Sequence, residues 1–324
     1  MRLFLSIFIF IFSLEAKVYN DLLGRSVEVG SAERVVFIGP GAMRMGTYMG
    51  IVPIAIESIE QRADNPPPYR VYLQKNLSKK LPSIGSGGAG VMPNIESLIA
   101  LKPDVIFSSF YSPKQIEQIS KKSKIPIIAL SYGSSYGGVS DDYLGDIKKS
   151  LLLIGDITAK SDRAKSVVSE IESIERDIKK LKLPDKKLYI GGIAFKGARG
   201  ITSTESQYPP FELLGVASTL ELAKKGHNEL SFEQFLSLDS DCIFIDEQSR
   251  DIVADEYRAK RAIFDNLRAY RDGCVYEVLA YNNYNTNIEN LLIIPYQIAS
   301  HLGVDADLKT HKNRVYRALY PKKL

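Results

Sequence analysis

Residues 94–107 read NIESLIALKPDVIF, and residues 231–245 read SFEQFLSLDSDCIFI, which repeats the same pattern later in the chain. In each copy a residue that commonly caps helices, Asn94 or Ser231, precedes a glutamate and a helical apolar pattern. An aspartate and a short apolar run follow at the same distance in both copies. Each copy therefore predicts a capped helix that leads into a buried strand, and the chain predicts two related units.

Short apolar runs alternate with helical patterns on both sides of this repeat. Such runs are typical of parallel strands that helices cover on both faces. The fold class is therefore predicted to be α/β, with two lobes that each contain a parallel sheet. The predicted strands are residues 34–39, 104–109 and 125–132 in the first lobe, and residues 187–195, 242–246 and 274–279 in the second lobe.

A segment without glycine or proline lies between the two units, and its apolar residues recur at helical spacing. We expect a single connecting helix over residues 156–184, ended by Pro184. It would join a first lobe of residues 17–155 to a second lobe of residues 185–324. Such a helix is a stiff connection that allows small hinge motions. An ordinary packed helix inside one domain is the alternative.

The first 16 residues, MRLFLSIFIFIFSLEA, have the build of a secretory signal peptide. One arginine precedes an apolar run that is shorter than the ~20 residues of a transmembrane helix. Ala16 is a small residue at the expected cleavage point. We expect a periplasmic protein, and an uncleaved N-terminal anchor is the alternative.

Composition excludes several classes of protein. The net charge of +4 is spread along the chain without a dense basic run, which argues against binding of nucleic acid. Three histidines are few for an enzyme that relies on acid–base catalysis, or for an adhesin that binds free zinc or manganese.

Cys242 and Cys274 each open an apolar run, so they are expected to start neighbouring strands. A disulfide and a pair of buried thiols both remain open.

Gly85, Gly87 and Gly90 have the G-x-G-x-x-G spacing of a dinucleotide-binding loop. In a dinucleotide-binding fold, however, the glycines themselves form the turn into the helix. Here three residues separate Gly90 from the expected helix cap at Asn94, and the second copy of the repeat has no such glycines. We therefore expect a flexible loop instead of a nucleotide site.

Several motifs follow one another along the chain: GRSVEV from Gly24, RVVFIGPGAMRM from Arg34, LPSIG, the two glutamate repeats, and YNNYNTNIENLLIIPYQIASHL from Tyr281. In this order and spacing the chain resembles the periplasmic substrate-binding proteins of ABC importers for iron-siderophores, haem, cobalamin and related metal chelates. The resemblance covers essentially the whole chain after residue 16. It implies two Rossmann-like lobes joined by one long helix, with the ligand in the cleft between them.

The resemblance implies a monomeric receptor that binds a metal chelate, with iron the expected metal, and delivers it to the permease dimer of an inner-membrane ABC importer. Haem, cobalamin and nickel or cobalt complexes stay open as ligands. It implies no catalysis and no cofactor; an exported metal-dependent enzyme or chelatase on a similar two-lobed fold is the alternative. Similar proteins present one glutamate from each lobe to arginine pockets of the permease, and these positions match Glu96 and Glu233. Their other expected role is to stabilise their own helices.

Loops at the carboxyl ends of the strands are expected to face the cleft. In siderophore-binding relatives, a histidine and a tyrosine in comparable loops complete the iron shell, so His227 and Tyr281 are the predicted metal ligands. A solvated loop histidine is the alternative for His227. Arginine side chains would bind the anionic face of a chelate. The predicted ligand-binding residues are Arg44, Tyr111, Tyr136, Arg199, His227, Tyr281, Asn283 and Tyr284.

Overall fold

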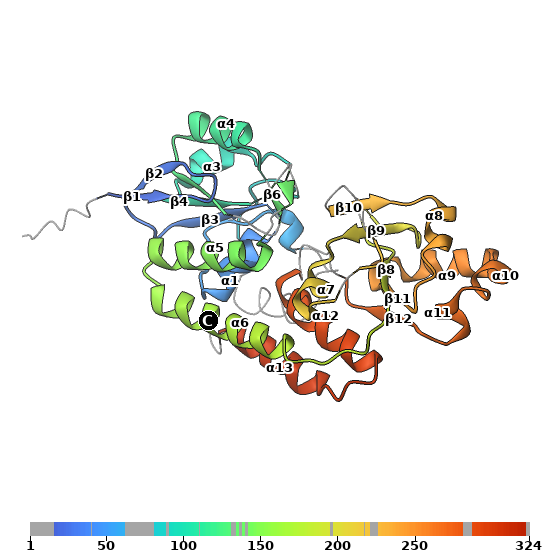
Figure 1. The fold of residues 1–324 in the computed structure, drawn as a ribbon. Helices are drawn as coiled ribbons and strands as arrows, with labels where there is room; N and C mark the ends of the chain where they lie inside the picture. The colour runs from blue at the N-terminus through green and yellow to red at the C-terminus, as the bar shows by residue number, and fades with distance from the viewer. Residues whose placement is uncertain are drawn as a thin grey trace, which may run out of the picture.

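The computed structural model describes residues 16–39, 41–61, 81–88, 91–109, 111–130, 134–135, 138–139, 142–194, 197–216, 218–220, 226–280 and 287–321. These residues form two α/β lobes that lie side by side, with helices along their lower side in Figure 1. The expected signal peptide lies almost wholly outside the described residues. Among the described residues, no helix is both long and apolar enough to cross a membrane.

The first lobe, here called the N-lobe, contains a parallel sheet in the order β3-β4-β5. All three predicted strands are confirmed, and each is shorter than predicted. Isolated parallel bridges at Ala55 and Ser83 extend the sheet beyond β3. The N-lobe elements are β1 (Lys17–Asn20), β2 (Ser26–Val29), β3 (Val35–Ile38), α1 (Ala42–Tyr48), η1 (Ser58–Gln61), α3 (Ile95–Leu101), β4 (Val105–Ser108), α4 (Pro113–Ser123), β5 (Ile127–Ala129), β6 (Ser134–Ser135), β7 (Gly138–Val139) and α5 (Tyr143–Ile157).

The second lobe, here called the C-lobe, contains a parallel sheet in the order β12-β11-β8. Its three predicted strands are also confirmed, whereas the antiparallel pair β9–β10 was not predicted. The elements after α5 are α6 (Ser161–Ile178), β8 (Leu188–Gly191), β9 (Ser203–Ser206), α7 (Pro209–Leu214), β10 (Gly226–Glu229), α8 (Phe232–Ser237), β11 (Cys242–Asp246), η2 (Glu247–Ser249), α9 (Arg250–Ala259), α10 (Arg261–Phe264), α11 (Arg268–Arg271), β12 (Val275–Val278), α12 (Asn287–His301) and α13 (Leu308–Leu319).

The connecting helix is shorter than the predicted span of residues 156–184. Residues 156–157 end α5, and α6 covers only Ser161–Ile178. The chain reverses at Ala159, whose φ of 53° is left-handed, and the Lys160 N–H donates to Gly155 O at 2.7 Å. Such a left-handed residue ends a helix. The periodic apolar pattern runs across this break, which is why the sequence did not predict it.

The repeated helix–strand unit is present in both lobes, as α3–β4 and α8–β11. The Asn94 side chain accepts from Ser97 N at 2.9 Å and caps α3. The Ser231 side chain accepts from Gln234 N at 3.1 Å and caps α8. Both caps are therefore the predicted residues, and each satisfies a backbone N–H that the helix itself leaves without a partner.

The aspartate of each repeat joins two neighbouring strands at their amino ends. Asp104 Oδ2 accepts from Arg34 N at 2.8 Å, just ahead of β3. Asp241 Oδ2 accepts from Lys187 N, also at 2.8 Å, just ahead of β8. Each lobe therefore contains its own copy of the helix, the strand and the aspartate hydrogen bond between strands.

One hydrophobic core continues beneath both sheets. On β3, Val35 and Phe37 belong to this shared core, whereas Val36 packs in a separate cluster of the N-lobe. On β8, Ile190 belongs to the shared core, whereas Tyr189 packs in a separate cluster of the C-lobe. The alternation follows from strand geometry, because successive side chains point to opposite faces. The buried faces of α5, α6, α12 and α13 complete the shared core.

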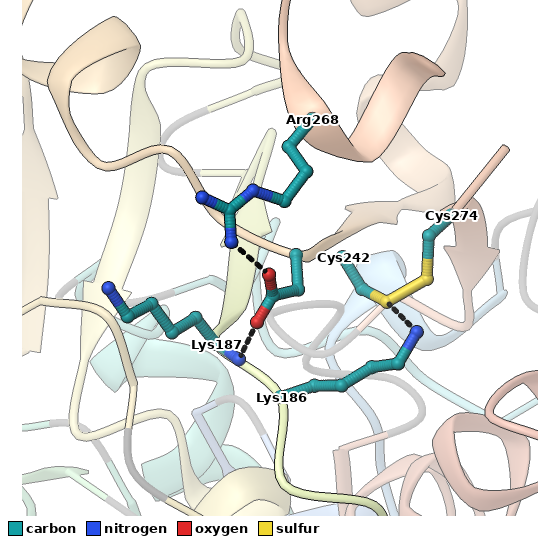
Figure 2. The surroundings of a disulfide bond; sticks show 6 residues. Lys186, Lys187, Cys242, Arg268 and Cys274 are labelled. Atoms are coloured by element: carbon teal, nitrogen blue, oxygen red, sulfur yellow. Dashed lines mark hydrogen bonds and ion pairs between the residues drawn. A yellow bond between two sulfur atoms is a disulfide. The ribbon is translucent and has the colours of Figure 1, made fainter. Parts of the chain in front are cut away.

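Cys242 and Cys274 form a disulfide, which decides the alternative that the sequence left open. As predicted, they lie at the starts of neighbouring parallel strands, β11 and β12. Both side chains are buried, and Lys186 Nζ donates to Cys242 Sγ at 3.7 Å (Figure 2). The bond encloses α9, α10 and α11 in one covalent loop of the C-lobe.

Replacing both cysteines by serine is expected to lower the free energy of unfolding. The disulfide links residues 32 positions apart, and removing a cross-link across a loop of this length costs about 3–4 kcal/mol by chain entropy. Urea unfolding of the wild type and of the Cys242→Ser/Cys274→Ser variant measures the difference. Wild type in dithiothreitol is the matched control. Equal urea midpoints for the oxidised protein and the double variant would contradict the prediction.

Candidate functional site

The two lobes face each other at the carboxyl ends of their parallel strands. Arg44 lies in the first turn of α1, which follows β3, and Glu289 lies in the first turn of α12, the next element after β12. Arg44 Nη1 donates to Glu289 Oε1, and both side chains are 2% exposed. Because ligands of open α/β sheets bind at these strand ends, the region between the lobes is the candidate site.

Arg44 therefore lies in the contact between the two lobes. Its Nη1 is bonded to Glu289 and also donates to Tyr320 Oη at 2.9 Å. The prediction that Arg44 binds a ligand stays a prediction, and the structure adds a contact between the lobes. Glu289 lies 245 residues away in the sequence, so no local pattern could have indicated the pair.

Glu57 is a buried carboxylate at the N-lobe side of this region, and sequence reasoning missed it. Its Oε2 accepts from Gly39 N at 2.9 Å, at the end of β3. Gly39 has a φ of 84°, and a Cβ there would lie 2.0 Å from Ser109 O, so only glycine fits. A glutamate inside the apolar run IVPIAIES was the available signal, because a charge in such a run points to a buried polar contact.

Tyr111 also lies at this edge, and it is 4% exposed. Its hydroxyl donates to Val91 O at 2.6 Å. Burial, and then the charge of Glu57, raise the pKa of the Tyr111 phenol well above its ordinary value. The hydroxyl therefore stays protonated at neutral pH, where it serves as a hydrogen-bond donor and not as a tyrosinate.

Arg199 lies beyond the end of β8, on the C-lobe side, and its side chain is exposed. Its backbone N–H donates to Ser249 Oγ at 2.9 Å, which fixes this segment to the turn after β11. Asp246 Oδ1 accepts from Gln248 N at 3.0 Å and shapes the same turn. The backbone at Arg199 is thus held in place beside the carboxyl end of the sheet.

His227 lies in β10, not in the loop that the sequence predicted, because Gly226–Glu229 pairs with β9. Its Nε2 is 2.9 Å from Ser203 Oγ, and that hydroxyl donates to Ile193 O at 2.6 Å. A hydroxyl has one hydrogen, so Ser203 accepts from His227 and Nε2 carries a proton. While this bond lasts, only Nδ1 can act as a metal ligand.

Four of the predicted ligand-binding residues, Tyr136, Tyr281, Asn283 and Tyr284, lie outside the described residues. The predicted metal pair of His227 and Tyr281 is therefore not tested. Within the part of the chain that the structure describes, no group of three or more histidine, cysteine or acidic residues could hold a metal ion.

A surface cavity of ≈ 880 Å³ lies elsewhere, between the segment ahead of β8 and the helix α8. It is lined by Lys186, Lys187 and Leu238 among others, which lie at the amino ends of the C-lobe strands. Because ligands of this type of sheet bind at the opposite strand ends, we do not place the candidate site there.

The two glutamates of the repeat are exposed, one on each lobe. Glu96 lies in the first turn of α3 and Glu233 in the first turn of α8. In Figure 1 both helices lie on the side of the molecule away from α6 and α13. The backbone N–H of Glu233, the Ser231 side chain and the charge of Lys260 lower the pKa of the Glu233 carboxyl. Glu233 is therefore ionised at neutral pH.

Comparison with known sequences identifies the fold family. The profile of the periplasmic binding protein family matches residues 63–281. The chain belongs to this family. It is 26% identical to the Fe(3+)-citrate-binding protein YfmC of Bacillus subtilis over 273 residues, which are 82% of this chain and 79% of YfmC.

Solved structures of periplasmic binding proteins have the same fold. Molybdate-bound MolA of Haemophilus influenzae superimposes with a TM-score of 0.69 at 20% identity, over 95% of this chain and 99% of MolA. The triscatecholate siderophore-binding protein FeuA of Bacillus subtilis, complexed with ferri-bacillibactin, gives 0.62 at 21% identity, over 89% of this chain and 98% of FeuA. The predicted two-lobed α/β class is therefore confirmed.

Replacing Tyr111 by phenylalanine is expected to lower the free energy of unfolding by about 1 kcal/mol, because the ring stays and one buried hydrogen bond, to Val91 O, is lost. Urea unfolding measures the change. Tyr19→Phe, at a half-buried position of β1, is the control for loss of a hydroxyl as such. If Tyr111→Phe and wild type have the same unfolding free energy, the hydrogen bond does not contribute to stability.

Proposed function

We propose that this periplasmic binding protein is the receptor of an ABC importer and binds a ferric chelate between its lobes. The single observation that carries the proposal is the family match across both lobes, at residues 63–281. YfmC is named for binding Fe(3+)-citrate, and the FeuA structure holds a ferric catecholate siderophore. Haem and nickel or cobalt complexes are less supported as cargo. No relative named here is an enzyme, which favours a receptor over the alternative of an exported enzyme or chelatase.

The proposed ligand contacts are the polar side chains at the carboxyl ends of the strands. Arg199 is exposed at the C-lobe edge and can reach a carboxylate or catecholate oxygen, for which a guanidinium is suited. Tyr111, at the N-lobe edge, is proposed to donate its hydroxyl to an acceptor on the ligand in place of Val91 O. His227, which lies within β10, is also proposed to contact the metal. Tyr136, Tyr281, Asn283 and Tyr284 complete the proposed set.

Glu96 and Glu233 are proposed to dock the receptor on the permease. They occupy the same position in two copies of one structural unit, and each is exposed on its own lobe. Two equivalent carboxylates on two related lobes suit a partner with two-fold symmetry, such as a permease dimer that offers an arginine to each. The receptor is proposed to act as a monomer in the periplasm, after cleavage near Ala16.

Reversing the docking charges is expected to abolish uptake without changing ligand binding. Glu96→Arg and Glu233→Arg place like charges opposite the proposed arginines, and such contacts are strongly unfavourable. The measurement is uptake of radiolabelled ferric citrate into vesicles that contain the importer, together with the receptor's affinity for the same chelate.

The matched control for these reversals is Glu117→Arg. Glu117 is an exposed glutamate on α4 of the N-lobe, whose surface ion pair with Lys121 contributes little to stability. We expect normal uptake with this variant. Normal uptake with both Glu96→Arg and Glu233→Arg would remove the docking proposal and leave the receptor proposal in place.

A further inference from the structure

A buried ion pair links the two lobes where they face each other. Arg44 belongs to α1 of the N-lobe, and Glu289 belongs to α12, which packs on α7 and β12 of the C-lobe. Each helix follows the carboxyl end of a strand in its own sheet, α1 after β3 and α12 after β12. The pair therefore joins the carboxyl-end sides of the two sheets. A change in the distance between the lobes here would have to stretch or break the pair.

Tyr320, just beyond α13, completes the cluster. Its hydroxyl accepts from Arg44 Nη1 at 2.9 Å and donates to the same carboxylate oxygen of Glu289 that Arg44 contacts. Its ring meets the ring of Tyr48, at the end of α1, edge-on at a centroid distance of 5.2 Å. Three segments that are far apart in the sequence therefore meet at one carboxylate oxygen.

The backbone around this cluster is held by α6. Arg163 Nε donates to Tyr48 O at 2.9 Å, where α1 ends. Arg163 Nη2 donates to Leu319 O at 2.7 Å, where α13 ends. Because Arg163 ties the ends of α1 and α13 to α6, a local shift of α1 is opposed when the Arg44–Glu289 contact changes in length. We therefore expect such a change to appear in the relative position of the lobes.

A buried ion pair is a weak source of stability, since the loss of hydration of two charges offsets most of their attraction. It is nevertheless selective for one geometry, because either charge without its partner is strongly unfavourable in an apolar surrounding. We propose that Arg44 and Glu289 are positioning residues that set the spacing of the two lobes before any ligand binds. This inference concerns the ligand-free protein, so it holds or fails independently of the proposed cargo.

The experiment measures the distance between spin labels on the two lobes by pulsed electron–electron double resonance. Labels are attached at Lys121→Cys on α4 and Arg258→Cys on α9, whose native side chains are 72% and 71% exposed. Both native cysteines are joined in the disulfide, so only the introduced cysteines react.

Two changes to the pair are compared. In Arg44→Met/Glu289→Leu both charges are replaced by apolar side chains, so neither charge is left buried without its partner. In Arg44→Lys the charge is kept but the reach and the planar geometry are lost, so this variant decides the question if the double variant does not fold. For both, we expect a distance distribution that is shifted or broader than that of the wild type.

The control is Arg314→Met. Arg314 Nη1 donates to Asp177 Oδ2 at 2.7 Å and joins α13 to α6, so it makes a partly buried contact between helices that does not involve Arg44 or Glu289. We expect wild-type distances for this variant. Wild-type distances in the folded variants of Arg44 and Glu289 would overturn the inference and leave the pair as a contact that does not position the lobes.

Discussion

The two parallel sheets share one hydrophobic core, and this constraint determines how the molecule can move. One face of each sheet packs on helices of its own lobe, and the other packs on the helical layer around α6. Opening the lobes widely would expose apolar surface of that layer at about 25 cal/mol per Å². A wide opening of the lobes is therefore unfavourable.

The repeated sequence unit explains why so much of the fold was predictable. A capped helix and a wholly apolar strand are local features, so Asn94, Ser231 and six strands were predicted from their own neighbourhoods. The break at Ala159 was not predicted, because a single left-handed residue leaves the apolar periodicity of the two flanking helices intact. The short antiparallel pair β9–β10 was missed for a related reason. Its residues are polar and mixed, and their pairing depends on contacts with the rest of the C-lobe.

The candidate site was less predictable than the fold. Strand ends could be located from the sequence, so Tyr111 and Arg199 were placed at the correct edges of the sheets. The partners of these side chains could not be found, since they come from distant segments. Arg44 is predicted to contact the ligand because an arginine after a strand suits an anion, and the structure adds a bond to Glu289 of the other lobe that the sequence did not indicate. For His227, the distant Ser203 fixes which ring nitrogen carries the proton.

A titration of the ligand-free protein, followed by tyrosine fluorescence, tests most directly whether this chain is a receptor for a ferric chelate. The chain has 18 tyrosines and no tryptophan, so the measured fluorescence comes from tyrosine without a tryptophan contribution. The ligands are ferric citrate, a ferric tris-catecholate, haemin and molybdate, each corrected for its own absorption. A ferric-chelate receptor predicts saturable quenching with one-to-one stoichiometry by at least one of the two ferric chelates and none by molybdate. Saturation by molybdate alone, or no saturation by any of the four, would contradict it.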